Sequence, residues 1–354
     1  MPQNGFIQTS GTKFTLNGLP FYFAGANNYY LSYKSEFMVN SVLDAAVAMG
    51  LKAIRTWAFL DRGSLDGSVP DTDPPGAKEG VYFQYWDPAA GAPAYHDTAD
   101  GLERLDFVIH AAGLRGLKLV LPLVNNWKEF GGMDQYASWF GLRSHDEFYT
   151  DAGAREAYRN WALHLLNRRN GYSGELYRDE PAILGWELAN EPRSEESEAL
   201  FDWVEEMSAF LKENDGNHLV GVGDEGQSDD EFLQIASIDF GTVHLYPEIL
   251  GKDFAWGARQ IEKRIRAGGQ AGKPVIVEEY GWKDRARREE AHLAWFETIE
   301  RAGGAGDLFW MLSGPQNDGT QYPDYDGYTI YGAADSPAIV THAVAMAARN
   351  LPDE

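Results

Sequence analysis

Two pairs of acidic residues stand near the ends of apolar segments. Glu187 and Glu191 occur in "ILGWELANEPR", a run that is apolar enough to be buried, and Glu278 and Glu279 occur in "PVIVEEYG". An unpaired buried carboxylate is costly, so folds avoid one unless it has a partner or a task. Two facing carboxyls can cleave a glycosidic bond, because one protonates the leaving oxygen while the other attacks or activates water.

The elements that would carry these residues form a repeating pattern. Short apolar runs alternate with helix-period segments such as "LERLDFVIHAAGLRG" and "REAYRNWALHLLNRR", which is typical of βα units around a parallel sheet. We count eight such pairs. The predicted strands are 21–28, 53–59, 118–125, 183–190, 219–226, 240–247, 274–281 and 307–313.

Loop lengths favour a (β/α)8 TIM barrel among α/β folds. Helix-to-strand links are brief and marked by glycine, whereas the strand-to-helix segments 60–97, 126–150 and 314–335 are long. In that barrel the strand-to-helix loops build the functional face. The opening "FIQTSGTKFTLNGLPFYF", with its Asn17-Gly18 turn, predicts a short N-terminal β-hairpin. We see no linker or repeat, so residues 1–354 are predicted to form a single domain.

Two places fit this pattern poorly. The fifth predicted helix, near 228–236, has only a weak helical periodicity of apolar residues. Pro122 removes a backbone donor inside the strand at 118–125, so we expect a bulge there or an earlier strand end.

Polar and aromatic residues collect at the predicted strand ends. The acidic ends of the fourth and seventh strands lie across the barrel from each other, where carboxyls could approach a substrate from two sides. Glu187 lies two pleats below Glu191, so we expect it to pair inside the barrel. Both faces of a barrel strand are buried, so alternation does not choose between Glu278 and Glu279. The candidates are Asn27, Asn28, Arg55, Trp57, Asn125, Asn126, Asn190, Glu191, Asp224, Glu225, His244, Tyr246, Glu278, Glu279 and Trp310.

Purely structural roles for these residues remain open. A lone glutamate at a strand end is more often a helix cap or an ion-pair partner than a catalyst. His244 fits a hydrogen-bonded core histidine as well as a site residue. An aromatic content of 13% suits a sugar cleft, whose rings stack on C–H faces, but most rings pack in any core.

Other chemistries find little support. The eight histidines are scattered without ligand spacing and there are no cysteines, so we expect no metal and no cofactor. A phosphate-binding glycine loop and a GxSxG nucleophile turn are missing from the sequence. The net charge of -24 repels nucleic acid and anionic membranes, and no apolar run is long enough to span a bilayer.

Seven ordered motifs resemble glycoside hydrolase family 5, and within it the endo-β-1,4-mannanases. They are "GANNYYL", "IRTWAF", "LVNNWKEFGGMDQY", "GWELANEPR", "IDFGTVHLYPE", "VEEYGW" and "YPDYDGYTIY". The resemblance covers nearly the whole chain. It implies a retaining (β/α)8 enzyme that acts on β-mannan or manno-oligosaccharides.

The resemblance also implies roles for individual residues. Glu191 would be the acid/base and Glu279 the nucleophile. Arg55 and Tyr246 would hold Glu279 ionised, so we expect a lowered pKa for Glu279 and a raised pKa for Glu191. The other implied substrate contacts are Trp57, Asn126, Trp127, Asn190, Arg193, His244 and Trp310.

Several alternatives stay open beside endo-mannanase action. They are an exo-acting β-mannosidase, a β-1,4-glucanase and a non-catalytic glycan-binding barrel. The short "GDEGQSDD" connection favours an open groove, although the 60–97 segment is long enough to fold over one end. We expect a monomer. The start of the chain lacks a signal-peptide pattern, and an extracellular enzyme whose signal has been trimmed is favoured over a cytoplasmic one.

Overall fold

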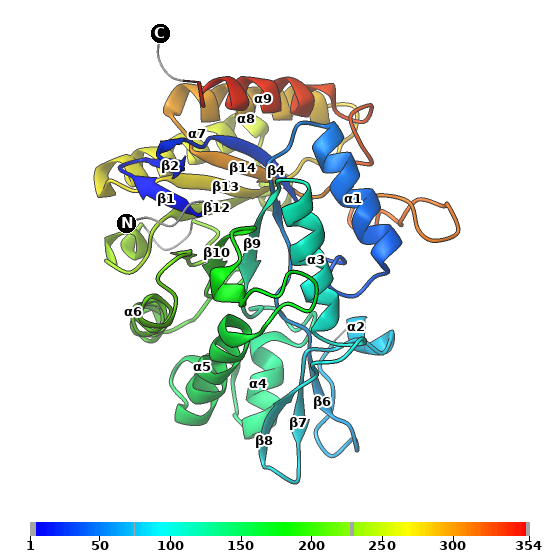
Figure 1. Ribbon diagram of the computed structural model, residues 1–354. Helices are drawn as coiled ribbons and strands as arrows, with labels where there is room; N and C mark the ends of the chain where they lie inside the picture. Colours follow the sequence, from blue (N-terminus) through cyan, green and yellow to red (C-terminus); the bar gives the residue numbers. More distant parts are fainter. Residues whose placement is uncertain (1–4, 74, 227–229, 352–354) are drawn as a thin grey trace.

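The computed structural model describes residues 5–73, 75–226 and 230–351, and its centre is a barrel of eight parallel strands (Figure 1). Spatial order follows chain order. Backbone bonds from Asp239 N to Val220 O (2.8 Å) and from His244 N to Glu225 O (3.3 Å) link the two outer strands, β11 and β12. The strands are β4 (Phe23–Asn27), β5 (Ala53–Arg55), β9 (Lys118–Pro122), β10 (Ile183–Glu187), β11 (Leu219–Gly221), β12 (Gly241–Leu245), β13 (Val275–Tyr280) and β14 (Gly306–Phe309).

The predicted barrel is confirmed, and its strands end earlier than expected. Strand β9 ends at Pro122, so the awkward proline marks a strand boundary. Residues 56–59 are buried although they follow the end of β5. Backbone bonds from Thr56 N to Val120 O and from Ala58 N to Pro122 O continue past the end of β5, and most candidate polar residues lie at or just beyond the strand ends.

Helices cover the outside of the barrel. Seven of the eight strands are followed by an α-helix of 12 residues or more, and side-chain caps at Ser35, Asp151 and Asp253 help to begin three of them. After β11 the described residues form only the 3₁₀ turn η3 (Glu231–Gln234), so the weak fifth helix is not an α-helix there, and residues 227–229 lie outside the described part. The helices are α1 (Glu36–Ala48), α3 (Glu103–Leu114), α5 (Ala152–Asn167), α6 (Ser197–Asn214), α7 (Phe254–Ala271), α8 (Arg288–Ala302) and α9 (Pro337–Ala348).

A small antiparallel sheet packs on the N-terminal ends of the barrel strands. It consists of β1 (Ile7–Ser10), β2 (Lys13–Leu16) and β3 (Leu19–Pro20), with the predicted turn at Asn17 and Gly18 between β2 and β3. Phe14 is fully buried in a cluster with the first residues of several barrel strands. The hairpin therefore seals the end of the barrel opposite the candidate residues.

The long loops fold into elements of their own. The segment after β5 forms a second three-stranded sheet, β6 (Asp61–Ser64), β7 (Gln84–Asp87) and β8 (Ala92–Tyr95), with the short helix α2 (Pro75–Lys78). This sheet lies beside α4 (Gly132–Phe140), which belongs to the loop after β9 (Figure 1). Hydrogen bonds from Thr72 to Gln135 tie the two loops together.

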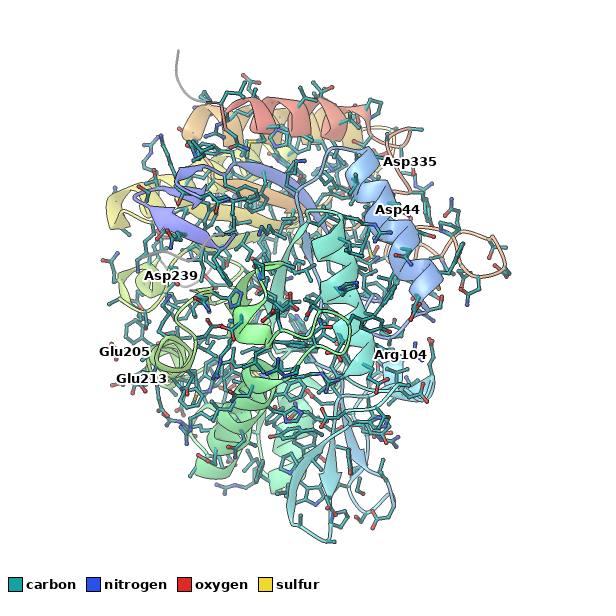
Figure 2. The ribbon with its side chains drawn as sticks, in the orientation of Figure 1. Asp44, Arg104, Glu205, Glu213, Asp239 and Asp335 are labelled. Carbon is teal, nitrogen blue, oxygen red and sulfur yellow. The ribbon has the colours of Figure 1, made fainter. Side chains whose placement is uncertain are left out.

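Acidic side chains are spread over the outer elements. Figure 2 shows Asp44 on α1, Glu205 and Glu213 on α6, and Asp239 and Asp335 at the periphery. Four of these five are exposed, and Asp239 is half-buried. The negative charge therefore reaches solvent on several sides. Among the described residues, no helix combines the length and the apolar character that crossing a bilayer requires.

Candidate active site

Glu279 lies near the end of β13 and is held by two donors. Arg55 Nη1 lies 2.5 Å from its Oε1, and the Tyr246 hydroxyl donates to its Oε2 at 2.8 Å. These partners come from β5 and from the residue after β12. The carboxyl is therefore fixed on both oxygens.

A bulge in β13 explains why two successive glutamates face the same interior. Val243 pairs with Val277 and His244 pairs with Glu279, so Glu278 is an extra residue in this ladder. Asn27 Nδ2 donates to the Glu278 carbonyl at 2.8 Å. Alternation along the sequence could not predict this, because the bulge depends on the neighbouring strand.

Glu191 lies four residues beyond the end of β10 in an uncommon backbone conformation. Its φ is 52°, the left-handed region that non-glycine residues rarely adopt, and its N–H donates to the Gly223 carbonyl at 2.9 Å. Its Oε1 lies 2.7 Å from His244 Nδ1, and its Oε2 accepts from Trp127 Nε1 at 2.6 Å. Three separate segments therefore fix the position of this carboxyl.

The two carboxyls are close together. Glu191 and Glu279 each place an oxygen within 4.8 Å of the other and of a His244 nitrogen. Carboxyl groups about 5 to 5.5 Å apart suit direct nucleophilic attack, whereas about 6.5 to 9.5 Å leaves room for an attacking water. Oxygens within 4.8 Å of each other favour the first arrangement.

Arg55 connects the interior of the barrel. It is fully buried, and its other donors reach Glu187 Oε2 (2.8 Å), Asn190 Oδ1 (2.8 Å) and Asn27 Oδ1 (3.3 Å). Glu187 thus pairs inside the barrel, as predicted. The side chain of Asn190 also donates to Asn125, which holds it beside Glu191.

The expected pKa order of the two carboxyls is wrong for this resting site. Burial raises the pKa of Glu191, but hydrogen bonds from His244 and Trp127 outweigh it and bring the pKa below its usual value. Burial raises the pKa of Glu279, and His244 and Arg55 only partly offset this rise. The donors His244 on β12 and Trp127 in the loop after β9 therefore reverse the order.

Trp310 lies after β14 beside other rings. Its indole N–H donates to Asp326 at 2.6 Å, and its ring stacks on Tyr29 with centroids 6.0 Å apart. Trp57 is buried between Phe59 and Trp310, with centroid distances of 5.2 and 6.0 Å. The half-buried Trp310 is more accessible to a sugar than Trp57, whose substrate contact stays a prediction.

Arg193 and Trp127, whose indole bonds to Glu191, line one cavity. The cavity has a volume of about 540 Å³. Arg193 lies over the Trp127 ring at 4.7 Å and forms two bonds to Glu225, at 2.6 and 2.7 Å. Asn126 Oδ1 accepts from the Arg193 N–H at 3.0 Å, so it positions the loop.

A glycine turn holds Trp127 in place. Gly132 has a φ of 58°, and a Cβ there would lie 2.2 Å from the Trp127 carbonyl oxygen. Only glycine fits this close approach without a backbone shift. The turn thus presents the half-exposed indole toward Glu191.

The site contains nitrogen and carboxylate oxygen atoms that could bind a metal ion, and they form hydrogen bonds instead. Glu191, His244 and Glu279 could each offer one such atom. These groups already hydrogen-bond to one another, to Trp127, to Tyr246 or to Arg55, so the network accounts for their proximity. The absence of a metal stays a prediction.

Sequence reasoning missed some partners and left others undecided. Asp326 and Tyr29 were not singled out, although both lie in motifs that carry the resemblance. Glu225 was a strand-end candidate without a role, and it pairs with Arg193. The sequence does not decide between Glu278 and Glu279 as the site residue, and in the structure Glu278 contacts His244. These contacts join segments distant in sequence, so only the acidic or aromatic residue type could signal them.

Comparisons with known proteins show the family of this chain. The model of a β-mannosidase-like family within glycoside hydrolase family 5 matches residues 4–298. Mannan endo-1,4-β-mannosidase F of Aspergillus fumigatus is 37% identical, over 93% of this chain and 75% of its own length. Mannan endo-1,4-β-mannosidase A of Aspergillus aculeatus is 34% identical, over 96% of this chain and 90% of its own.

A solved structure is similar over almost the full length. The endo-1,4-β-mannanase from Rhizomucor miehei superposes with a TM-score of 0.87 at 36% identity, and the match covers 97% of this chain and 99% of that chain. Family match, sequence identity and shared fold lead to one assignment. This chain belongs to the β-mannosidase-like enzymes of glycoside hydrolase family 5.

Proposed function

We propose that the protein hydrolyses internal β-1,4-mannosidic bonds of mannan, glucomannan or manno-oligosaccharides with retention of anomeric configuration. The relatives named above are endo-mannanases, and the match to them spans most of this chain. The observation that carries the proposal is the short distance between the Glu191 and Glu279 carboxyls, with oxygens within 4.8 Å. This spacing supports a covalent route.

The two glutamates perform complementary steps in the proposed reaction. In the reactive form the proton that the two carboxyls share lies on Glu191. Glu279 then attacks the anomeric carbon as a carboxylate, the bond to the leaving oxygen breaks, and that oxygen takes the Glu191 proton. Glu191 then removes a proton from water, which attacks the same carbon and releases Glu279. Arg55 and the Tyr246 hydroxyl support the departing carboxylate of Glu279. Two inversions at one carbon give net retention.

Surfaces on both sides of the carboxyls support internal attack. Trp310 and Tyr29 offer rings for the sugar being cleaved, and in this proposal Asn190, which Arg55 orients, binds its 2-hydroxyl. The cavity with Trp127 and Arg193 gives room for a sugar on the leaving side. A polysaccharide cannot cross a membrane, so the proposal includes an extracellular site of action.

Digestion of mannohexaose tests the proposal directly. Proton NMR should show the β-anomer of the newly formed reducing end first, with products of mixed length. Cellohexaose is the control for substrate class and should be cut far more slowly. Initial α-anomer would exclude the covalent route, and mannose as the sole early product would indicate exo action.

A further inference from the structure

His244 is clamped between two acids in a dry part of the site. Its Nδ1 lies 2.7 Å from Glu191 Oε1, and its Nε2 lies 3.1 Å from Glu278 Oε2. The His244 side chain is 1% exposed and that of Glu278 is fully buried. Water therefore cannot replace either contact.

The hydrogen atoms on this line can be counted. An ionised carboxylate only accepts hydrogen bonds, and a neutral imidazole has one donor and one acceptor. With both acids ionised, both His244 nitrogens must carry a hydrogen. With a neutral imidazole, either Glu191 or Glu278 must hold a proton toward it. Two protons are therefore required along the line from Glu191 to Glu278.

The surrounding charges favour the doubly protonated imidazole. Burial lowers the pKa of His244, but the nearby carboxylates raise it well above its usual value. Burial raises the pKa of Glu278, but Arg55 and the bonds from Glu187 and His244 bring it below its usual value. The ionisable groups around His244 are Glu191 beyond β10, Glu225 beyond β11, Tyr246 after β12, Glu278 and Glu279 on β13, and Arg55 on β5, which bonds to Glu279.

We propose that Glu278 keeps His244 protonated on both nitrogens, and that this buried imidazolium controls the ionisation of Glu191 during turnover. The inference rests on the proposed function, since it gives Glu191 the acid/base role. Glu278 is a positioning residue that acts through His244. When Glu191 passes its proton to the leaving oxygen, the new carboxylate faces a cation that is already in place. His244 itself neither gains nor loses a proton.

Glu278→Gln tests this idea with little change in shape. The amide oxygen can still accept from Nε2, but it carries no charge, so His244 should lose a proton within the working pH range. Loss of the cation raises the pKa of both Glu191 and Glu279, and both limbs of the pH profile of kcat/KM should move upward by about one unit. A purely structural role would lower activity without moving the limbs. Glu278→Asp keeps the negative charge, so the limbs of its pH profile should lie closer to their wild-type positions than those of Glu278→Gln.

Glu187→Gln is the matched control. Glu187 is equally buried and bonds to Arg55 and to Glu278, with no bond to His244 among the described residues, and a glutamine there can still donate to Glu278. Burial holds the pKa of Glu187 well above its usual value, so glutamine mimics the protonated form already present. The limbs of this variant should stay at their wild-type positions.

Nitrogen-15 NMR of histidine-labelled wild-type enzyme gives an independent readout. Both His244 nitrogens should be protonated across the active pH range, and in Glu278→Gln one should deprotonate there. A singly protonated His244 in the wild type would overturn the inference, even if the variant failed to fold. Unmoved limbs in an active Glu278→Gln enzyme would also overturn it. Failure of the proposed function would instead appear as no hydrolysis of mannohexaose by the wild type.

Discussion

Replacing Trp127 by phenylalanine removes one hydrogen bond from Glu191 and keeps an aromatic ring beneath Arg193. The bond from Nε1 to Glu191 Oε2 is 2.6 Å, and the Arg193 guanidinium lies 4.7 Å from the ring. A hydrogen bond to a charged group contributes about 1.5 to 3 kcal/mol. Trp127 is 39% exposed, so water replaces part of this and about 1 kcal/mol should be lost. That loss raises the pKa of Glu191 by about 0.7 units.

The pH dependence of kcat/KM on mannohexaose measures this change. In the resting site Glu191 has the lower pKa of the two carboxyls. Activity falls on the acidic side when both carboxyls are protonated, so the acidic limb follows the pKa of Glu191. That limb should move upward by about 0.7 units in Trp127→Phe. Trp139→Phe is the control, because its indole N–H donates to the Arg62 carbonyl at 2.9 Å and touches no carboxyl. An unmoved acidic limb in a folded Trp127→Phe enzyme would refute the reasoning.

Three further predictions follow from the site and the loop that supports it. Glu279→Ala should abolish release of reducing ends from mannan, whereas Glu191→Gln should retain cleavage of activated aryl mannosides, which need little protonation of the leaving group; near wild-type rates in Glu279→Ala would disprove the assignment. Glu225→Gln should free Arg193 and raise KM for mannohexaose about 2- to 5-fold with little change in kcat, because a partly exposed ion pair contributes about 0.5 to 1 kcal/mol; equal losses on an aryl mannoside would argue against a leaving-side contact. Burial raises the pKa of Asp61 to about 8, so the folded chain keeps this proton while the unfolded chain loses it near pH 4, and unfolding free energy falls between those pH values. The stability of Asp61→Asn relative to the wild type should therefore increase with pH, on the order of 1 kcal/mol per pH unit in that window. Urea unfolding at pH 5 and pH 8 measures the difference between the two proteins. A difference that is the same at both pH values would contradict the raised pKa of Asp61.

The barrel could be predicted from the sequence more closely than its strand ends. The alternation of apolar runs and helical segments depends on burial, so the order of the eight strands and the N-terminal hairpin are confirmed, although no α-helix follows β11 among the described residues. Strand ends depend on pairing. Residues 56–59 stay buried beyond the end of β5, and Thr56 and Ala58 still bond to Val120 and Pro122 of β9, so burial could not reveal where the strand ends.

The candidate site follows the same division. Glu191 and the pair Glu278 and Glu279 could be proposed because they stand at the ends of strands on opposite sides of the barrel, and the family resemblance selects Glu279 from that pair. The orientation of Glu278 could not, because a bulge against β12 determines it. The order of the carboxyl pKa values could not be predicted either, since the donors His244 and Trp127 reach Glu191 from β12 and from the loop after β9.

Trapping the covalent intermediate tests the central claim most directly. A 2-deoxy-2-fluoro-mannobiosyl fluoride forms the first bond readily and hydrolyses slowly, so the enzyme should accumulate as an adduct. Mass spectrometry of a digest should place one fluoromannobiosyl group on the peptide that carries Glu279, at that carboxyl. A label on Glu191 or another acid, or steady turnover of the reagent with no adduct, would contradict the assignment of Glu279 as the nucleophile.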